Sequence, residues 1–176
     1  MTGIIDPATL LAPTVLLSVV LLPLTWVLAR ATGGRPLAAL AASGSLVAVA
    51  DATVVRPGLL HGYANWGGVA AACHLTDPSV MSREAVLNVA LLVPFGLFAV
   101  LALRGTMPIT VAVPIVVLSA ATISVVVEAT QAAYGIGVCD SSDIDHNTVG
   151  ALLGTLLGAL VHGWTARPVK AARLRV

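Results

Sequence analysis

Charged residues are scarce in this sequence: Asp, Glu, Lys and Arg together make up 10% of its 176 residues, against 58% hydrophobic residues. Soluble domains carry about 25% charged residues, so this composition excludes an ordinary water-soluble fold. Five apolar stretches of about membrane-spanning length fill most of the chain: residues 8–29, 36–55, 85–103, 105–127 and 147–166. We predict an all-α integral membrane bundle of about five transmembrane helices. It forms a single domain over residues 1–176, because the spans leave no room for a separate soluble domain.

Several motifs are also lacking. The chain has no Walker loop and no dinucleotide-binding glycine motif, so we expect no cofactor. It also has no convincing Ser-His-Asp order of a catalytic triad. It has no inverted repeat, which disfavours a transporter that works as a single chain. Asp140, Asp143, Asp145 and His146 leave a bound cation open as an alternative. Their spacing matches no calcium-binding loop, and we assign no metal site.

Basic residues are few and unevenly distributed. Seven of the nine follow alternate spans: Arg30, Arg35, Arg104, Arg167, Lys170, Arg173 and Arg175. On the positive-inside rule these segments face the cytoplasm, which places the N-terminus and the loops 57–83 and 133–145 outside. The basic C-terminal tail suits anionic lipid headgroups, at about 1 kcal/mol per charge. We therefore expect membrane lipids, and not nucleic acid, as its partners.

Two features predict how the spans pack. Residues 104–108 make so short a turn that the spans before and after it must be antiparallel neighbours. In the last span, Gly150, Gly154 and Gly158 recur every four residues and leave one helix face almost without side chains. We expect another helix to lie in that groove, because small residues let membrane helices approach closely.

Polar residues of several spans gather at one end of the predicted bundle. Asn88 begins the third span, Glu128 and Gln131 end the fourth, and Asp143 and Asn147 begin the fifth. At a rise of 1.5 Å per residue, they lie within about 10 Å of the outer interface. The i,i+3 and i,i+4 spacings predict that each pair on one helix shares a face. Ionisable residues in membranes usually face the bundle interior and often mark functional sites.

Four segments resemble the VanZ-like family of bacterial membrane proteins: NVALLVPFG from Asn88, EATQ from Glu128, CDSSD from Cys139 and NTVG from Asn147. Their order and spacing carry the resemblance, which covers a core of about residues 84–160. The resemblance implies a multi-pass protein of the bacterial cell membrane. The founding member of the family is associated with low-level resistance to the glycopeptide teicoplanin. No established reaction comes with the resemblance.

The resemblance also implies which polar residues matter. The polar set of the family maps by position onto Asn88, Glu128, Gln131, Asp140, Asp143 and Asn147. Gly137 stands where the family commonly has an Arg, three residues before the first Asp of its motif. Any role of that Arg in countering the carboxylates or binding an anionic substrate would have to fall to Arg56 or Arg83.

Two interpretations of this polar set stay open. In the first, Glu128 and Asp143 form a carboxylate pair for general acid–base catalysis. The other four residues then bind a lipid-linked or cell-wall-related molecule near the outer leaflet. In the second, the protein is non-catalytic and the set serves helix packing or partner binding, since interhelical hydrogen bonds in membranes contribute about 0.6 kcal/mol each. Ser141 and Ser142 are expected to cap the last span.

The chain has only two cysteines, Cys73 and Cys139, and both fall in predicted outer loops where oxidation is possible. We predict a disulfide between them, with two unrelated thiols as the alternative. On the chain-entropy model, closing a loop of about 67 residues stabilises a protein by about 4 kcal/mol. The bond would also tie the long loop over residues 140–143 as a lid.

The charge pattern predicts the sidedness of the bundle. A cysteine introduced beside Gly105 should resist an impermeant maleimide in intact cells, because it faces the cytoplasm, and should react once the cells are permeabilised. A cysteine at Ser79, in the outer loop, is the control and should react in intact cells. Labelling beside Gly105 without permeabilisation would contradict the predicted topology.

Overall fold

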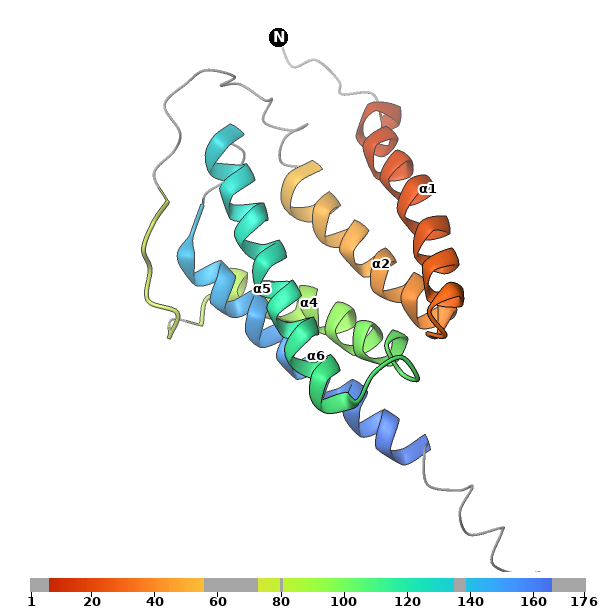
Figure 1. The fold of residues 1–176 in the computed structure, drawn as a ribbon. Helices are drawn as coiled ribbons and strands as arrows, with labels where there is room; N and C mark the ends of the chain where they lie inside the picture. The colour runs from red at the N-terminus through yellow and green to blue at the C-terminus, as the bar shows by residue number, and fades with distance from the viewer. Residues whose placement is uncertain (1–6, 56–72, 80, 135–138, 166–176) are drawn as a thin grey trace, which may run out of the picture.

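The computed structural model describes residues 7–55, 73–79, 81–134 and 139–165, which form long helices and no strand. The helices are α1 (Pro7–Ala31), α2 (Pro36–Ala50), α4 (Arg83–Ala102), α5 (Ile109–Tyr134) and α6 (Ser141–Thr165), and α2 continues as a π-helical segment, η1 (Asp51–Val55). Within the described residues, five spans, with α2 and η1 counted together, are long and apolar enough to cross a membrane. The predicted all-α membrane bundle is therefore confirmed (Figure 1).

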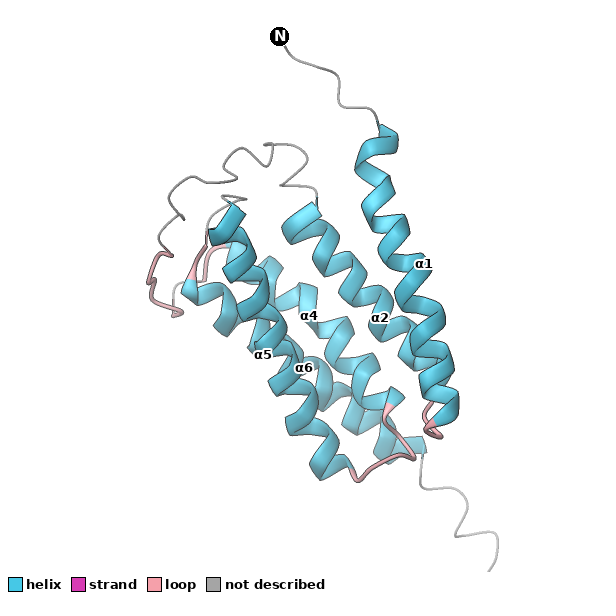
Figure 2. Ribbon diagram, turned by 45° about the horizontal axis from the view of Figure 1, so that its top comes forward, coloured by secondary structure: helices cyan, strands magenta, loops and turns pink. Residues whose placement is uncertain are grey.

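Successive helices run in opposite directions (Figure 2), and the two ends of the bundle carry different charged residues. The acidic end, as we call it, holds the starts of α4 and α6, and every Asp and Glu of the described residues lies at or near it: Asp51, Asp77, Glu84, Glu128, Asp140, Asp143 and Asp145. The arginine end holds the turns 32–35 and 103–108, with Arg30, Arg35 and Arg104. Which end faces the cytoplasm stays a prediction from the charge pattern.

The two turns of the arginine end pack on each other. The backbone N–H of Arg35 donates to the carbonyl of Ala102 at 3.0 Å, and a Cβ on Gly34 would lie only 2.8 Å from the same oxygen. Gly33 and Gly105 have φ angles of +77° and +96°, a conformation that residues with side chains rarely adopt. Glycine therefore makes both turns tight enough to meet.

Helix α4 is the centre of the bundle. It packs chiefly against α6, then against α2, and to a smaller extent against α5. The short turn correctly predicts α4 and α5 as antiparallel neighbours, yet α6 is the closer partner. Helix α1 packs on α2 and η1, and many of its large apolar side chains stay exposed, as expected of a helix that faces lipid.

The face of α6 without side chains holds α4. A Cβ on Gly154 would lie 2.0 Å from the carbonyl oxygen of Val93, and a Cβ on Gly96 of α4 would lie 2.2 Å from that of Ala151. The other two glycines of the predicted groove come as close to α4. Real Cβ atoms essentially never approach within 3.0 Å of another heavy atom, so only glycine allows this contact. The predicted groove is confirmed, and α4 is the helix that fills it.

Substitution of Gly154 by Leu should force α4 and α6 apart and destabilise the protein by about 3 kcal/mol or more, because overpacking against backbone cannot relax by rotamer change. Gly163→Leu is the matched control, since nothing lies within 4 Å of a Cβ at that position of the same helix. Thermal unfolding in detergent measures both. Equal melting temperatures for the two variants would contradict the groove.

Candidate functional site

Two helix starts shape the acidic end. Ser82 caps α4, its Oγ accepting a hydrogen bond from the Ala85 N–H at 3.1 Å. Helix α6 begins after Asp140, whose Oδ1 accepts from the Ser142 N–H at 2.9 Å. Asp140, and neither of the two expected serines, therefore caps α6. A carboxylate accepts this bond more strongly than a hydroxyl and is favoured at the positive end of the helix dipole.

The predicted disulfide joins the start of α6 to a distant loop. Cys73 and Cys139 are bonded, with Cα atoms 4.6 Å apart, within the normal range for a disulfide. Their sequence separation is 66 residues. The bond places residues 73–79, which we call the strap, beside the start of α6.

Hydrogen bonds continue the contact that the disulfide begins. The His74 N–H donates to the carbonyl of Cys139 at 2.9 Å, and the Ser141 N–H donates to the carbonyl of His74 at 3.0 Å. The Thr76 hydroxyl donates to Oδ1 of Asp140. The lid expected from the two cysteines is therefore present, and it rests on the residue that caps α6.

Glu128 holds the same segment from the opposite side. Its side chain is 4% exposed, and its Oε2 accepts from the Asp140 N–H at 2.9 Å. The charges of Asp140 and Asp143 act on this carboxylate. A buried carboxylate bonded to a backbone N–H fixes the chain just before α6, so Glu128 positions the cap and the strap together.

Asp143 connects the starts of α4 and α6. The side chain of Asn88, one turn into α4, lies close enough to act on its carboxylate. Glu84, Asp140 and His146 also act on it electrostatically. Two residues that the sequence singles out, Asn88 and Asp143, are thus brought into contact by the close packing of their helices.

Gln131 and Asn147 have other neighbours. Nε2 of Gln131 donates to the carbonyl of Thr53 in η1 at 2.9 Å, and Nδ2 of Asn147 donates to Oγ of Ser124 on α5 at 2.7 Å. The members of each predicted pair therefore contact different elements, because the packing partners change within about one turn. Within the described residues, Oε1 of Gln131 and Oδ1 of Asn147 are buried without a hydrogen-bond partner.

A polar cavity of about 520 Å³ lies between the strap and the starts of α4 and α6. Its lining residues are Thr76, Asp77, Ser82, Glu84, Ala85, Asp140, Ser142, Asp143 and His146. Of the six residues in the predicted set, only Asp140 and Asp143 line it. Glu128, a predicted catalytic candidate, is not among the lining residues.

The predicted disulfide places the long loop over residues 140–143, but the sequence does not single out Thr76 and Asp77 as the strap residues that line the cavity. The predicted site set also leaves out Ser82 and Glu84 at the start of α4. Pairing a capping serine with an acidic residue in the first turn marks a helix start. Nothing in the sequence says that this helix start faces that of α6.

His146 closes the inner wall of the cavity. It is 6% exposed, and its Nε2 lies 3.0 Å from the carbonyl of Pro78 in the strap. Its Nδ1 is buried and has no hydrogen-bond partner among the described residues. Asp143 precedes His146 by three residues, so the two side chains lie on the same face of α6.

The carboxylates of the strap side are held ionised. Burial raises the pKa of Asp140, but hydrogen bonds from Thr76 and Ser142 outweigh that effect and leave the pKa below its usual value. The Ser79 N–H, which donates to Oδ1 of Asp77 at 2.9 Å, likewise lowers the pKa of the Asp77 carboxyl. The cavity therefore keeps negative charge at neutral pH.

The geometry gives no ligand set for the cation alternative. Among the described residues, no three His, Cys, Asp or Glu side chains converge as metal ligands do. Asp145 is exposed and does not line the cavity. Acidic side chains that are spread around a space of this size can instead accept hydrogen bonds from a polar ligand.

The comparisons with known proteins place the chain in a family. A model of the VanZ/LLP1 family matches residues 14–162, from the first span to the last. The match reaches further toward the N-terminus than the core of about residues 84–160 that the motifs indicate. Comparison with curated proteins and with solved structures found no match. Because the family model covers well over half of the chain, this multi-pass membrane protein belongs to the VanZ/LLP1 family.

Proposed function

We propose that this protein acts in the bacterial cell envelope, on a lipid-linked or cell-wall-related molecule bound at the acidic end near the outer leaflet, and that it contributes to glycopeptide resistance. The polar cavity between the strap, α4 and α6 carries the proposal. Its volume of about 520 Å³ is in the usual range for small-molecule sites. It also lies at the ends of membrane-spanning helices, where a headgroup would be within reach.

The lining of the cavity favours a headgroup that donates hydrogen bonds. Four of its nine lining residues are carboxylic acids, and none of the nine is Lys or Arg. Carboxylates accept bonds from hydroxyl and ammonium groups and repel phosphate. The part of the ligand inside the cavity is therefore a hydroxyl- or amine-bearing group, such as a sugar or an amino acid.

A phosphate of the same ligand would lie at the rim. Arg83, at the first position of α4, is exposed and acts on the neighbouring Glu84. It can take the place of the Arg that the family commonly has where this chain has Gly137. Gly137 and Arg56, the other candidate, lie outside the described residues.

Within this proposal, the two predicted catalytic residues have different roles. Asp143 lines the cavity beside His146 and accepts a proton or a hydrogen bond from the ligand. Glu128 acts through the Asp140 N–H and holds the cavity wall. Asn88 orients Asp143, and Asp140 contacts both strap and ligand.

The second candidate function is non-catalytic, with the polar residues serving assembly or partner binding. The observation in its favour is that Glu128, Gln131 and Asn147 each bond to another element, at Asp140, Thr53 and Ser124. Such contacts hold a bundle together without any ligand.

Asp143→Asn should abolish the change in teicoplanin susceptibility that the protein gives a sensitive host, while protein level and melting temperature stay near those of the parent. The amide keeps the shape of the carboxylate but cannot take up a proton, and loss of a general acid–base group costs about 100-fold or more in rate. Asp145→Asn, an exposed position on the same helix, is the control and should keep the phenotype.

Glu128→Gln separates the two candidate functions further, because its amide oxygen can still accept from the Asp140 N–H. If Glu128 only positions the wall, the phenotype survives this change while Asp143→Asn removes it. Loss of the phenotype at a normal protein level would instead assign chemistry to Glu128. If both variants and Asp145→Asn all keep the full phenotype, the assembly function stands. Comparing muropeptides and lipids of deletion and parent strains would then identify the class of molecule affected.

A further inference from the structure

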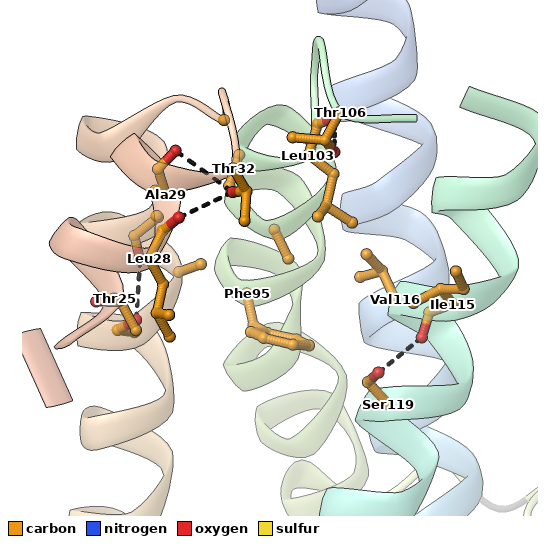
Figure 3. Close-up of a pocket in the computed structure, with 16 residues that line it drawn as sticks. Thr25, Leu28, Ala29, Thr32, Phe95, Leu103, Thr106, Ile115, Val116 and Ser119 are labelled. Atoms are coloured by element: carbon orange, nitrogen blue, oxygen red, sulfur yellow. Dashed lines mark hydrogen bonds between the residues drawn. The ribbon is translucent and has the colours of Figure 1, made fainter. Parts of the chain in front are cut away.

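A second cavity, of about 380 Å³, lies at the opposite end of the bundle from the polar site. Figure 3 shows Phe95 of α4 between Thr25 and Leu28 of α1 on one side and Ile115 and Val116 of α5 on the other. Leu103 and Thr106 close it toward the arginine end (Figure 3). We call this space the lipid groove.

The lipid groove is open to the surroundings of the bundle along its length. Leu28 and Ile115, on its two edges, are 52% and 43% exposed. Helix α1, which carries Leu28, packs on α2 and η1, whereas α5, which carries Ile115, packs on α6, α4 and η1. The two helices that form the edges of the groove therefore do not close over it. Small side chains, Ala99 and Ala102 on α4 and Ala39 on α2, leave the space between them.

The groove offers an apolar lining in which the hydroxyl donors are already used. Thr25 donates to the carbonyl of Leu21 at 2.9 Å, and Ser119 donates to that of Ile115 at 2.8 Å. Thr32, Ser43 and Thr106 likewise donate to carbonyls of their own helix or turn. No donor of these five side chains is left for a polar ligand, so the lining favours a hydrocarbon chain.

The length of the groove fits one leaflet. Ser119 lies ten residues beyond Ile109, the first residue of α5. At 1.5 Å per residue this is about 15 Å, half of a hydrocarbon core about 30 Å thick. A further hollow that shares Ile115 and Ser119 continues along α5 to Ile123.

The polar end of the occupant would meet positive charge. Gly34, Leu103 and Thr106 line the groove. Arg35 directly follows Gly34, and Arg104 directly follows Leu103. Arg30 lies in the last turn of α1, with its guanidinium 4.8 Å from the centre of the Trp26 ring. All the Asp and Glu residues of the described chain lie toward the other end. The charge therefore complements an anionic headgroup.

We propose that the lipid groove binds one acyl chain of an anionic glycerophospholipid, whose phosphate headgroup lies among Arg30, Arg35 and Arg104. This site is separate from the polar cavity and does not depend on the proposed function. It assigns the two ends of the bundle to different molecules, an anionic lipid at the arginine end and a hydrogen-bond-donating headgroup at the acidic end.

Native mass spectrometry of the full chain in detergent tests the headgroup preference, with phosphatidylglycerol and phosphatidylcholine of identical chains as probes. Phosphatidylglycerol should be retained at least fivefold more than phosphatidylcholine. Arg35→Gln should lower its retention about fivefold, the effect of roughly one surface charge. Arg35→Lys keeps the charge and should retain it as the parent does. Equal retention of the two lipids by the parent would overturn the proposal.

A groove-filling variant tests the acyl-chain site itself. Ser119 is exposed on the edge of the groove, so Ser119→Trp can fill the space without entering the core. It should lower retention of phosphatidylglycerol severalfold. Val126→Trp, at a 58% exposed position of the same helix outside the groove, should not. Equal retention by the two variants would refute the site.

Photo-crosslinking locates the chain independently of stability. Phosphatidylglycerol with a photoreactive group on one acyl chain should label peptides that contain Leu28, Phe95 or Ile115 more than the exposed face of α6. Labelling spread evenly over the exposed faces of the helices would contradict a defined groove.

Discussion

The contact between α4 and α6 is the constraint on which the rest of the structure depends. Glycines on both helices remove the side chains that would hold the backbones apart, and Gly154 meets Val93 where even a methyl group would not fit. In a membrane, where lipid is as apolar as leucine, close backbone approach is what drives such an association. Because the two helices run in the same direction, this contact also brings their starts together, and the polar cavity forms between those starts.

Polar groups at the acidic end are costly in a bilayer unless they have partners, and the structure supplies partners across helices for several of them. Asp140 connects them: its N–H bonds to Glu128 on α5, and its carboxylate bonds to Thr76 in the strap and to the first turn of α6. The cavity wall is thus held from three directions. Gln131 and Asn147 add contacts to η1 and α5, which orient those elements without reaching the cavity.

Much of the fold could be predicted from the sequence, because hydropathy reports the spans and glycine spacing reports the close helix face. The disulfide followed from two cysteines in loops of the same side. The site was less predictable, since i,i+3 spacing places Glu128 and Gln131 on one face of α5 but does not say which neighbours that face meets. The strap residues Thr76 and Asp77 carry no motif, and their position depends on a covalent bond to a segment 66 residues away. The lipid groove was not predictable either, because it is a gap between helices and not a pattern along one.

The strap also sets an order of biogenesis. Cys73 is synthesised 66 residues before Cys139. The two can be joined only after α5 has crossed the membrane and the start of α6 lies on the same side as the strap. Until then, the wall formed by Asp140 and Thr76 does not exist. The polar cavity is therefore completed late in assembly, and a chain stalled or truncated before α6 would carry most of the spans but none of the completed site.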